Sequence, residues 1–144
     1  MKVKIINDSP YGLPTYETHS AAGMDIHANI TEPITLGPLE RTLIPTGLRM
    51  QLPQGYECQI RPRSGLALKH GLSIVNTPGT VDADFRGDIG IILINLSNEP
   101  YTITPGERIA QMVIKEYVHV EWEPVKHIDT TERGKGAFGH TGTE

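Results

Sequence analysis

The chain has 144 residues, a mass of 15.8 kDa and a formal net charge of −4, which predicts one domain of ordinary size. Lys and Arg form no long cluster, so no broad basic surface for nucleic acid is expected. The longest apolar run, residues 91–94, is far shorter than the ~20 residues that span a membrane, so no membrane partner is expected. The N-terminus lacks a signal-peptide core, and the single Cys58 excludes an intrachain disulfide. We therefore expect a cytoplasmic protein.

β-branched residues interrupted by scattered Gly and Pro predict an all-β sandwich or barrel. Residues 43–52 are expected to form one long strand or a pair, because Pro45 and Gly47 interrupt them. Residues 56–61 alternate between apolar and polar side chains, which predicts a half-buried strand with Cys58 as an inert core residue.

One segment has the composition of a helix, residues 64–71, with Ser64 as its expected cap and Gly71 at its end. Arg63, Ser64 and Gly65 stand where this helix begins. Free N–H groups and a guanidinium favour an anion there, although a capped helix with a solvated Arg fits the same residues.

Two further strands are expected before the C-terminal tail. Residues 89–95 are nearly all apolar, which indicates a strand buried on both faces. Residues 118–122 alternate and predict another half-buried strand, with Trp122, like Met112, in the core.

Asp82 begins an acidic segment, residues 82–88, expected at a hairpin tip between two strands. Three carboxylates so close together could hold a metal or activate water, and apolar surroundings near Val81 would raise the basicity of Asp82. A solvent-exposed acidic turn is the alternative. The six histidines lack metal-ligand spacing.

The tail, residues 129–144, is Gly-rich and too polar for a core strand, so we divide the chain into a core of residues 1–128 and a flexible arm of residues 129–144. Its G-x-G-x-x-G pattern is not a dinucleotide motif, because no strand precedes it and no helix can follow. The composition suits a flap that closes over phosphates and stacks Phe138 on a base. A frayed terminus is the alternative.

The order of these segments resembles the homotrimeric dUTP pyrophosphatases (dUTPases). Five motifs of that family stand in its order: AGMDI at 22–26, RPRSGLA at 61–67, GTVDADFRG at 79–87, GERIAQ at 106–111 and RGKGAFGHTG at 133–142. The resemblance implies a distorted jelly-roll subunit and a homotrimer with shared active sites, over which each C-terminal arm closes at a neighbour. It also implies Mg²⁺-assisted hydrolysis of dUTP to dUMP and pyrophosphate, which lowers dUTP and supplies dUMP for thymidylate synthesis.

The resemblance assigns chemistry to individual residues. Asp82 matches the general base that activates water for attack on the α-phosphorus. Asp25 matches the carboxylate that reaches Mg²⁺ through water, an ion that needs no protein cage. The residues that match phosphate contacts are Arg63, Ser64, Gly65, Gln111, Arg133 and Thr141.

The nucleoside is expected to bind along residues 76–85, where backbone groups would pair with the uracil edge. The residues implied in uracil and deoxyribose binding are Asn76, Gly79, Val81, Phe85, Phe138 and Gly139. Asn76 would hold an ordered water, Phe138 would stack on uracil, and Phe85 would crowd out a 2′-hydroxyl. Three positions depart from the family pattern: Phe85 for Tyr, Ala137 for Gly and His140 for Ser.

Two other functions fit parts of the sequence. A dCTP deaminase shares the fold expected here, but that family uses R-S-S and a catalytic Glu, where this chain has Gly65 and Ile92. An apolar side chain cannot shuttle protons. A nucleotide-sensing or protein-docking module is the other alternative, against which an intact Asp82 and an intact arm both argue.

Overall fold

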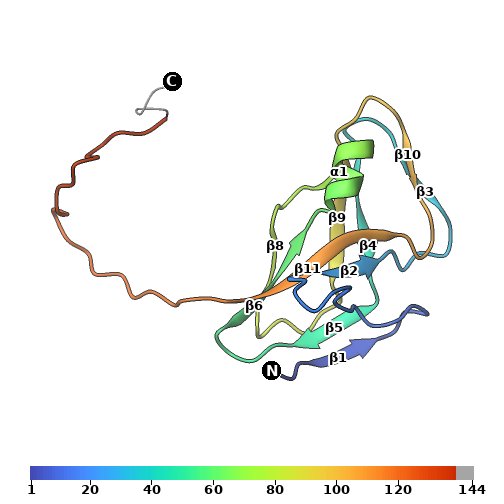
Figure 1. Cartoon of the computed structure of the whole chain (residues 1–144), viewed down its shortest axis with the longest axis horizontal. Helices are drawn as coiled ribbons and strands as arrows, with labels where there is room; N and C mark the ends of the chain where they lie inside the picture. Colours follow the sequence, from blue (N-terminus) through green and yellow to red (C-terminus); the bar gives the residue numbers. More distant parts are fainter. Residues whose placement is uncertain (139–144) are drawn as a thin grey trace.

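The computed structural model describes residues 1–138, and it confirms the all-β class (Figure 1). One short helix, α1, stands among eleven strands in the described residues. The elements are β1 Lys4–Asn7, β2 Met24–His27, β3 Ile34–Leu36, β4 Arg41–Pro45, β5 Leu48–Gln51, β6 Tyr56–Arg61, α1 Ser64–His70, β7 Leu72–Ile74, β8 Gly79–Val81, β9 Gly90–Asn95, β10 Tyr101–Ile103 and β11 Arg108–Glu116.

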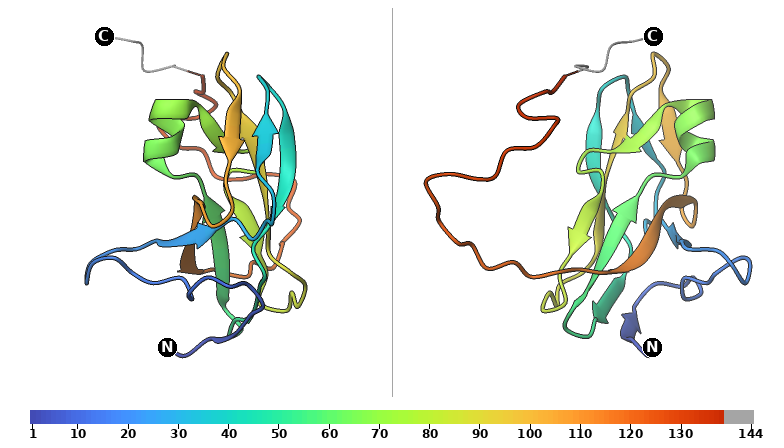
Figure 2. Two further views of the ribbon diagram at one scale, coloured as in Figure 1. Left: turned by 90° about the vertical axis from the view of Figure 1, so that its right-hand side faces the viewer. Right: turned by 60° about the vertical axis from the view of Figure 1, so that its left-hand side comes forward.

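The strands form a jelly-roll-like sandwich, as expected (Figure 2). A four-stranded antiparallel sheet has the order β2-β11-β6-β8, and a three-stranded sheet has the order β4-β9-β7. Two further antiparallel sheets have two strands each, β1-β5 and β10-β3. One apolar core joins both larger sheets, with Ile26 and Met112 from the first and Ile44 and Leu93 from the second almost fully buried. In residues 1–138 no helix is long and apolar enough to cross a membrane.

Several local predictions are confirmed. The segment from 43 to 52 is a pair of strands, and Gly47 between them adopts a left-handed φ of 71°. Cys58 and Ile60 point inward from β6. Helix α1 ends at Gly71, whose φ of 65° allows its N–H to bond to the carbonyl of Ala67. The predicted cap is wrong, because Ser64 is already the first helical residue and Arg63 occupies the cap position without a side-chain bond.

The prediction that residues 89–95 are buried on both faces is wrong in part. The strand exists as β9, but Ile91 and Leu93 are buried while Ile92 and Ile94 are half-buried. Only one face of its sheet meets the core, and residues 1–138 do not fully cover the other face.

The strand predicted at residues 118–122 is absent from the described structure. β11 leaves the sheet after Glu116, and the chain then runs away from the body (Figure 1). Val118 is 86% exposed and Trp122 is 85% exposed, so the prediction of a core Trp122 is also wrong, whereas that of a core Met112 is confirmed. The alternation is present in the sequence, but no strand among residues 1–138 pairs with the segment.

The expected hairpin with its tip at residues 82–88 is also wrong. β8 pairs with β6, while β9 pairs with β4 and β7, so no ladder joins β8 to β9. The loop at 82–89 instead crosses from one sheet to the other. Its far end is fixed where the Thr46 hydroxyl donates to the Ile89 carbonyl at 2.6 Å.

Burial raises the pKa of the Cys58 thiol to about 12. The folded protein should therefore react very slowly with a disulfide reagent at pH 8, and the urea-unfolded protein should react quickly. Because the raised pKa favours the protonated thiol, this contribution to stability is complete below the ordinary thiol pKa and falls as pH rises toward 12. Rapid labelling of the native protein at pH 8 would show that Cys58 is accessible.

Candidate active site

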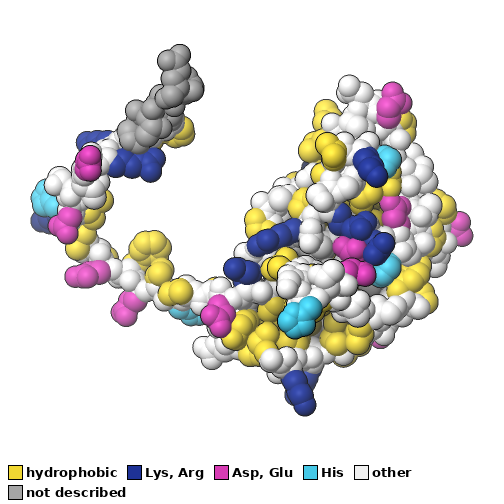
Figure 3. Space-filling view, in the orientation of Figure 1, with side chains coloured by type: hydrophobic (Ala, Val, Ile, Leu, Met, Phe, Trp, Pro, Cys, Tyr) yellow, Lys and Arg dark blue, Asp and Glu magenta, His cyan; other side chains and the backbone are white. Residues whose placement is uncertain are grey.

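Three polar side chains meet on the outer face of the four-stranded sheet, beside α1. Arg63 Nε donates to Asp25 Oδ1 at 3.0 Å, and Arg108 Nη1 lies 3.3 Å from Asp25 Oδ2. Figure 3 shows basic and acidic side chains gathered on this face, over β2 and β11. We call Asp25, Arg63 and Arg108, with Gln111, the anion cluster.

Strand pairing explains why these residues meet. Asp25 on β2 lies directly opposite Gln111 on β11, and Gln111 lies opposite Arg61 at the end of β6, two residues before Arg63. Residues directly opposite each other on antiparallel strands share a face of the sheet. The adjacent β2, β11 and β6 therefore place the anion cluster at one edge of the sandwich.

Gln111 fixes the backbone in front of the helix. Its Nε2 donates to the Pro62 carbonyl at 2.9 Å. An amide nitrogen carries two N–H donors, so one remains for a ligand. A Cβ at Gly23 would overlap Oε1 of Gln111, so glycine at position 23 permits this orientation of the amide.

The first turn of α1 completes this half of the site. Ser64 and Gly65 are exposed there, and no acidic residue stands in the turn. Their N–H groups, the Ser64 hydroxyl and the Arg63 guanidinium are all hydrogen-bond donors, which suit the oxygens of a phosphate. The predicted phosphate residues Arg63, Ser64, Gly65 and Gln111 are thus brought together.

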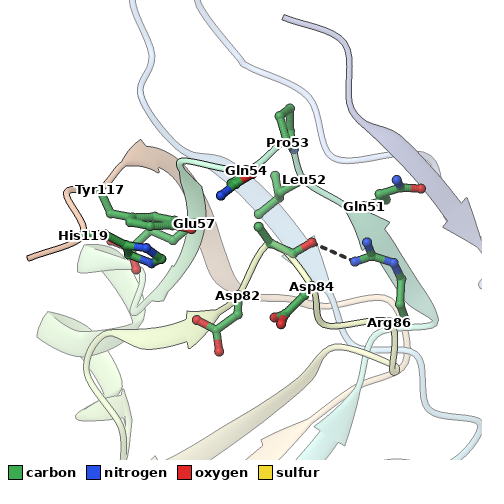
Figure 4. Close-up of a pocket in the computed structure, with 11 residues that line it drawn as sticks. Gln51, Leu52, Pro53, Gln54, Glu57, Asp82, Asp84, Arg86, Tyr117 and His119 are labelled. Atoms are coloured by element: carbon green, nitrogen blue, oxygen red, sulfur yellow. Dashed lines mark hydrogen bonds between the residues drawn. The ribbon is translucent and has the colours of Figure 1, made fainter. Parts of the chain in front are cut away.

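Asp82 lies elsewhere, at the start of the loop after β8. It is exposed and lines a groove of about 800 Å³ together with Glu57, Asp84 and Arg86 (Figure 4). The rings of Tyr117 and His119, which are tilted by 35° with their centroids 5.0 Å apart, line one side. Asp82 therefore stands in an exposed groove lined mainly by polar and charged residues, and not in the apolar surroundings predicted for it.

The turn that carries Asp82 is held by hydrogen bonds between its own residues. The Phe85 N–H donates to the Asp82 carbonyl at 3.2 Å. Arg86 Nη1 donates to the carbonyls of Ala83 at 2.7 Å and Phe85 at 2.8 Å, the first of which Figure 4 marks. Phe85 is 43% exposed, and its ring lies so close to Gly87 that a Cβ there would stand 2.6 Å from Cζ.

The predicted nucleoside residues on β8 offer mainly backbone. Val81 points into the core opposite Cys58 and is 8% exposed, so its side chain is not available to a ligand. Gly79 is buried beside the exposed Asn76, and a Cβ at Gly79 would stand 3.1 Å from Asn76 Nδ2. A small cavity of about 50 Å³ is lined by Asn76, Gly79 and Val81 among others.

Asp82 and the anion cluster are not neighbours within one chain. β8 and β2 are the two edges of their sheet, three strand spacings or ~14 Å apart. The strand register also separates Asp82 from Asp25 along the direction of β6. Val81, the residue before Asp82, lies opposite Cys58, whereas Asp25 lies opposite Gln111, which in turn lies opposite Arg61. In Figures 1 and 2, α1 and the loop after β8 lie toward opposite ends of the molecule.

Comparison with known proteins identifies this arrangement. The dUTPase family model matches residues 10–142. The chain belongs to the dUTPase family. It is 56% identical over 142 residues to the deoxyuridine 5′-triphosphate nucleotidohydrolase of Fusobacterium nucleatum subsp. nucleatum, across 99% of this chain and 97% of that protein. The corresponding protein of Finegoldia magna is 55% identical, across 99% of each chain.

A solved dUTPase has the same fold. A mutant of the Staphylococcus bacteriophage 80alpha dUTPase, with dUpNHpp, superposes with a TM-score of 0.88 at 27% identity and covers 98% of both chains. The similarity therefore extends over nearly the full length of both chains.

The described part of the arm in this dUTPase chain, residues 129–138, does not approach its own anion cluster. Arg133 and Phe138 are exposed, and Arg133 Nε donates to the carbonyl of Gly136, within the arm itself, at 3.0 Å. Figures 1 and 2 show residues 129–138 extending far from the sandwich. The predicted contacts Gly139 and Thr141 lie outside the described residues.

Sequence reasoning gave no role to several residues of this dUTPase site. Arg108 stands within the fourth motif, but nothing in the motif shows that it reaches Asp25. Gly23, Gly87 and Arg86 shape the two clusters and stand in the first and third motifs. Their positions in motifs were the available signal, whereas their contacts depend on the fold.

Proposed function

We propose that this protein hydrolyses dUTP to dUMP and pyrophosphate. The observation that carries the proposal is that four predicted phosphate residues converge beside Asp25, in a chain 56% identical over nearly its whole length to a named dUTPase. We propose that the protein acts in the cytoplasm. There this reaction lowers the concentration of dUTP and provides dUMP for thymidylate synthesis.

The anion cluster is proposed to bind the triphosphate. Arg63 uses Nε on Asp25 and Nη1 on the Arg108 carbonyl, at 2.9 Å, which leaves Nη2 for a phosphate oxygen. Ser64, Gly65 and Gln111 supply further donors. Hydrogen bonds between charged groups and phosphate are about twice as strong as neutral ones, so this cluster fixes the position of the phosphate chain.

Asp82 is proposed as the general base. An exposed carboxylate on a turn held by backbone bonds can accept a proton from water that stands in line with the α-phosphorus. Such a base contributes ~10²–10⁴-fold to the rate, so positioning and charge neutralisation supply the larger part.

The residues present fit Mg²⁺ as the predicted cofactor. No group of three His, Cys, Asp or Glu side chains that could hold a metal occurs in residues 1–138, so these residues offer no closed cage. Mg²⁺ commonly binds through one carboxylate, waters and substrate phosphates. Asp25 would hold it through water, and the bound ion would neutralise charge on the triphosphate.

Base recognition is proposed along residues 76–85. Backbone groups of Gly79 and Val81 pair with the uracil edge, and Asn76 holds a water there. Cytosine presents the wrong donors and acceptors, and a buried mismatch of this kind can discriminate by about 10⁴–10⁵-fold. Phe85, supported on Gly87, packs against the deoxyribose, while Phe138 and Gly139 of the arm cover the base.

We propose a homotrimer whose sites are shared between subunits. Asp82 and Asp25 stand at opposite edges of one sheet, so a second copy must supply the missing half of each site. The exposed, alternating apolar side chains of residues 118–122 support association, because an unpaired extended segment pairs readily with another chain. Residues 1–128 form the core, and the arm, 129–144, with Arg133 and Thr141 as its phosphate contacts, closes over a neighbour's site.

Assembly can be tested by mass and by mixing. Sedimentation should give about 47 kDa, three times 15.8 kDa. Trimers reassembled from two inactive variants, Asp82→Asn and Arg63→Gln, should regain part of the activity, because some sites then receive an intact half from each chain. A monomeric active enzyme, or no recovery from demonstrably mixed trimers, contradicts shared sites.

The substrate proposal is tested by measuring pyrophosphate release from dUTP, dCTP, dTTP and UTP side by side. We expect turnover of dUTP and at least ~10³-fold lower kcat/KM for the others, because each places a mismatched group in a closed pocket. Ammonia from dCTP would indicate a deaminase. Binding of nucleotide without turnover would indicate a sensing module.

Gly23→Ala should lower kcat/KM for dUTP ~10-fold or more, because the added methyl group overlaps Oε1 of Gln111 and turns its amide from Pro62. Gly12→Ala is the control, since a Cβ at Gly12 meets nothing within 4 Å. Steady-state kinetics with thermal unfolding of both variants checks the prediction. Equal kinetics for the two variants would show that the orientation of Gln111 does not matter.

A further inference from the structure

We propose that Arg108 is a positioning residue for the phosphate-binding half of the site: it holds the Asp25 carboxylate and the Arg63 guanidinium in their working arrangement. The inference rests on the proposed function, because it concerns how the anion cluster acts on dUTP. None of the roles implied by the family resemblance above falls on Arg108.

Arg108 touches both residues. Its Nη1 lies 3.3 Å from Asp25 Oδ2, while its backbone carbonyl accepts from Arg63 Nη1 at 2.9 Å. Arg63 in turn donates Nε to Asp25 Oδ1 at 3.0 Å. The three residues therefore form a closed ring of contacts, in which Arg108 uses side chain and main chain together.

A β-bulge places Arg108 on this face. Between β11 and β2 the register shifts between Arg108 and Ala110, so Arg108 lies opposite His27 while Ala110 lies opposite Ile26. Ile109 and Ala110 are consecutive and both fully buried, which a regular strand does not allow. The extra residue turns Arg108 to the side of Asp25 and Gln111, and without the bulge it would lie on the other face.

The charges explain what Arg108 does there. The side chain of Asp25 is only 21% exposed and stands between two guanidinium groups, one on each oxygen. Without Arg108, Arg63 would be the remaining cation on Asp25 and would be free to turn its planar fork onto both carboxylate oxygens, as Arg–carboxylate pairs commonly do. The donors that face the phosphate would then be lost to Asp25.

Glu17 provides a contrast. It is the other acidic partner of Arg108, at 3.4 Å, but its side chain is 68% exposed. Exposed ion pairs contribute little. Glu17→Gln should therefore leave kcat/KM for dUTP within about 3-fold of the unchanged protein, and it is a matched control for the loss of one partner of Arg108.

The decisive experiment is a double-mutant cycle between Arg108→Gln and Asp25→Asn, with kcat and KM for dUTP measured separately. Arg108→Gln alone should lower kcat/KM ~10–100-fold with a raised KM, the range seen when groups that orient a first contact are removed. In the Asp25→Asn background the same change should cost less than about 3-fold, because residues that act through each other are not additive. Arg108→Lys keeps the charge but not the planar fork of donors, so its kcat/KM should lie between that of Arg108→Gln and that of the unchanged protein.

Losses that multiply in the double variant would overturn the proposal, since Arg108 would then act independently of Asp25, as a direct phosphate contact does. An unchanged kcat/KM in Arg108→Gln would overturn it as well. Thermal unfolding identifies a variant that fails to fold, in which case Arg108→Lys carries the cycle. Absence of dUTP hydrolysis by the unmodified protein would instead contradict the proposed function.

Discussion

Replacing Asp82 with Asn is expected to lower kcat for dUTP ~10²–10⁴-fold while dUTP still binds. The amide keeps the size of the carboxylate but cannot take a proton from water. The phosphate and base contacts lie on other residues, so Kd measured by calorimetry should change little. The rate is measured as pyrophosphate release under saturating dUTP.

Asp84→Asn is the matched control for this change. Asp84 lines the same groove two residues further along, and both carboxylates are exposed (Figure 4). Its loss should change kcat by less than about 3-fold, the scale of surface electrostatics. An Asp84→Asn variant as slow as Asp82→Asn would show that the rate depends on the negative charge of the loop and not on one base. An Asp82→Asn variant with undiminished kcat would exclude Asp82 as the base.

Removal of the residues after Thr131 should lower kcat ~100-fold or more while the oligomer stays intact. The arm carries Arg133, Thr141 and Phe138, the proposed contacts to the terminal phosphate and the uracil ring. Loss of such groups opens the site to water and releases the substrate from its aligned position, and small misplacements alone cost about 10²-fold. Single-turnover kinetics and sedimentation of the truncated protein check both parts.

A Phe138→Ala variant separates stacking from closure. It removes the fully exposed ring but leaves the rest of the arm, so a smaller loss than that from truncation is expected. Undiminished turnover after truncation would show that the arm has no part in the reaction. Dissociation of the truncated oligomer would show that the arm acts in assembly.

Much of the sandwich could be predicted because its signals are local. The alternation in β6, the interruption between β4 and β5 and the glycine that ends α1 each depend on neighbouring residues alone. Residues 118–122 alternate just as clearly, yet they pair with nothing in residues 1–138. A strand needs a partner as well as a pattern, and sequence periodicity does not say whether that partner lies in the same chain.

The candidate site was predictable at the level of motifs but not of contacts. Asp25, Arg63 and Gln111 come together as the motifs implied, because β2, β11 and the end of β6 are neighbours. The contact of Arg108 with Asp25 depends on a bulge, which has no reliable sequence signal here. The expected hairpin around Asp82 was wrong because β8 and β9 belong to different sheets, which local turn residues do not show.

The chemical step is tested most directly by hydrolysis of dUTP in ¹⁸O-labelled water, with mass spectrometry of both products. If Asp82 directs water to the α-phosphorus, the label enters dUMP and the pyrophosphate stays unlabelled. Label in the pyrophosphate would mean attack on the β-phosphorus, which contradicts the proposed positions of base and phosphates.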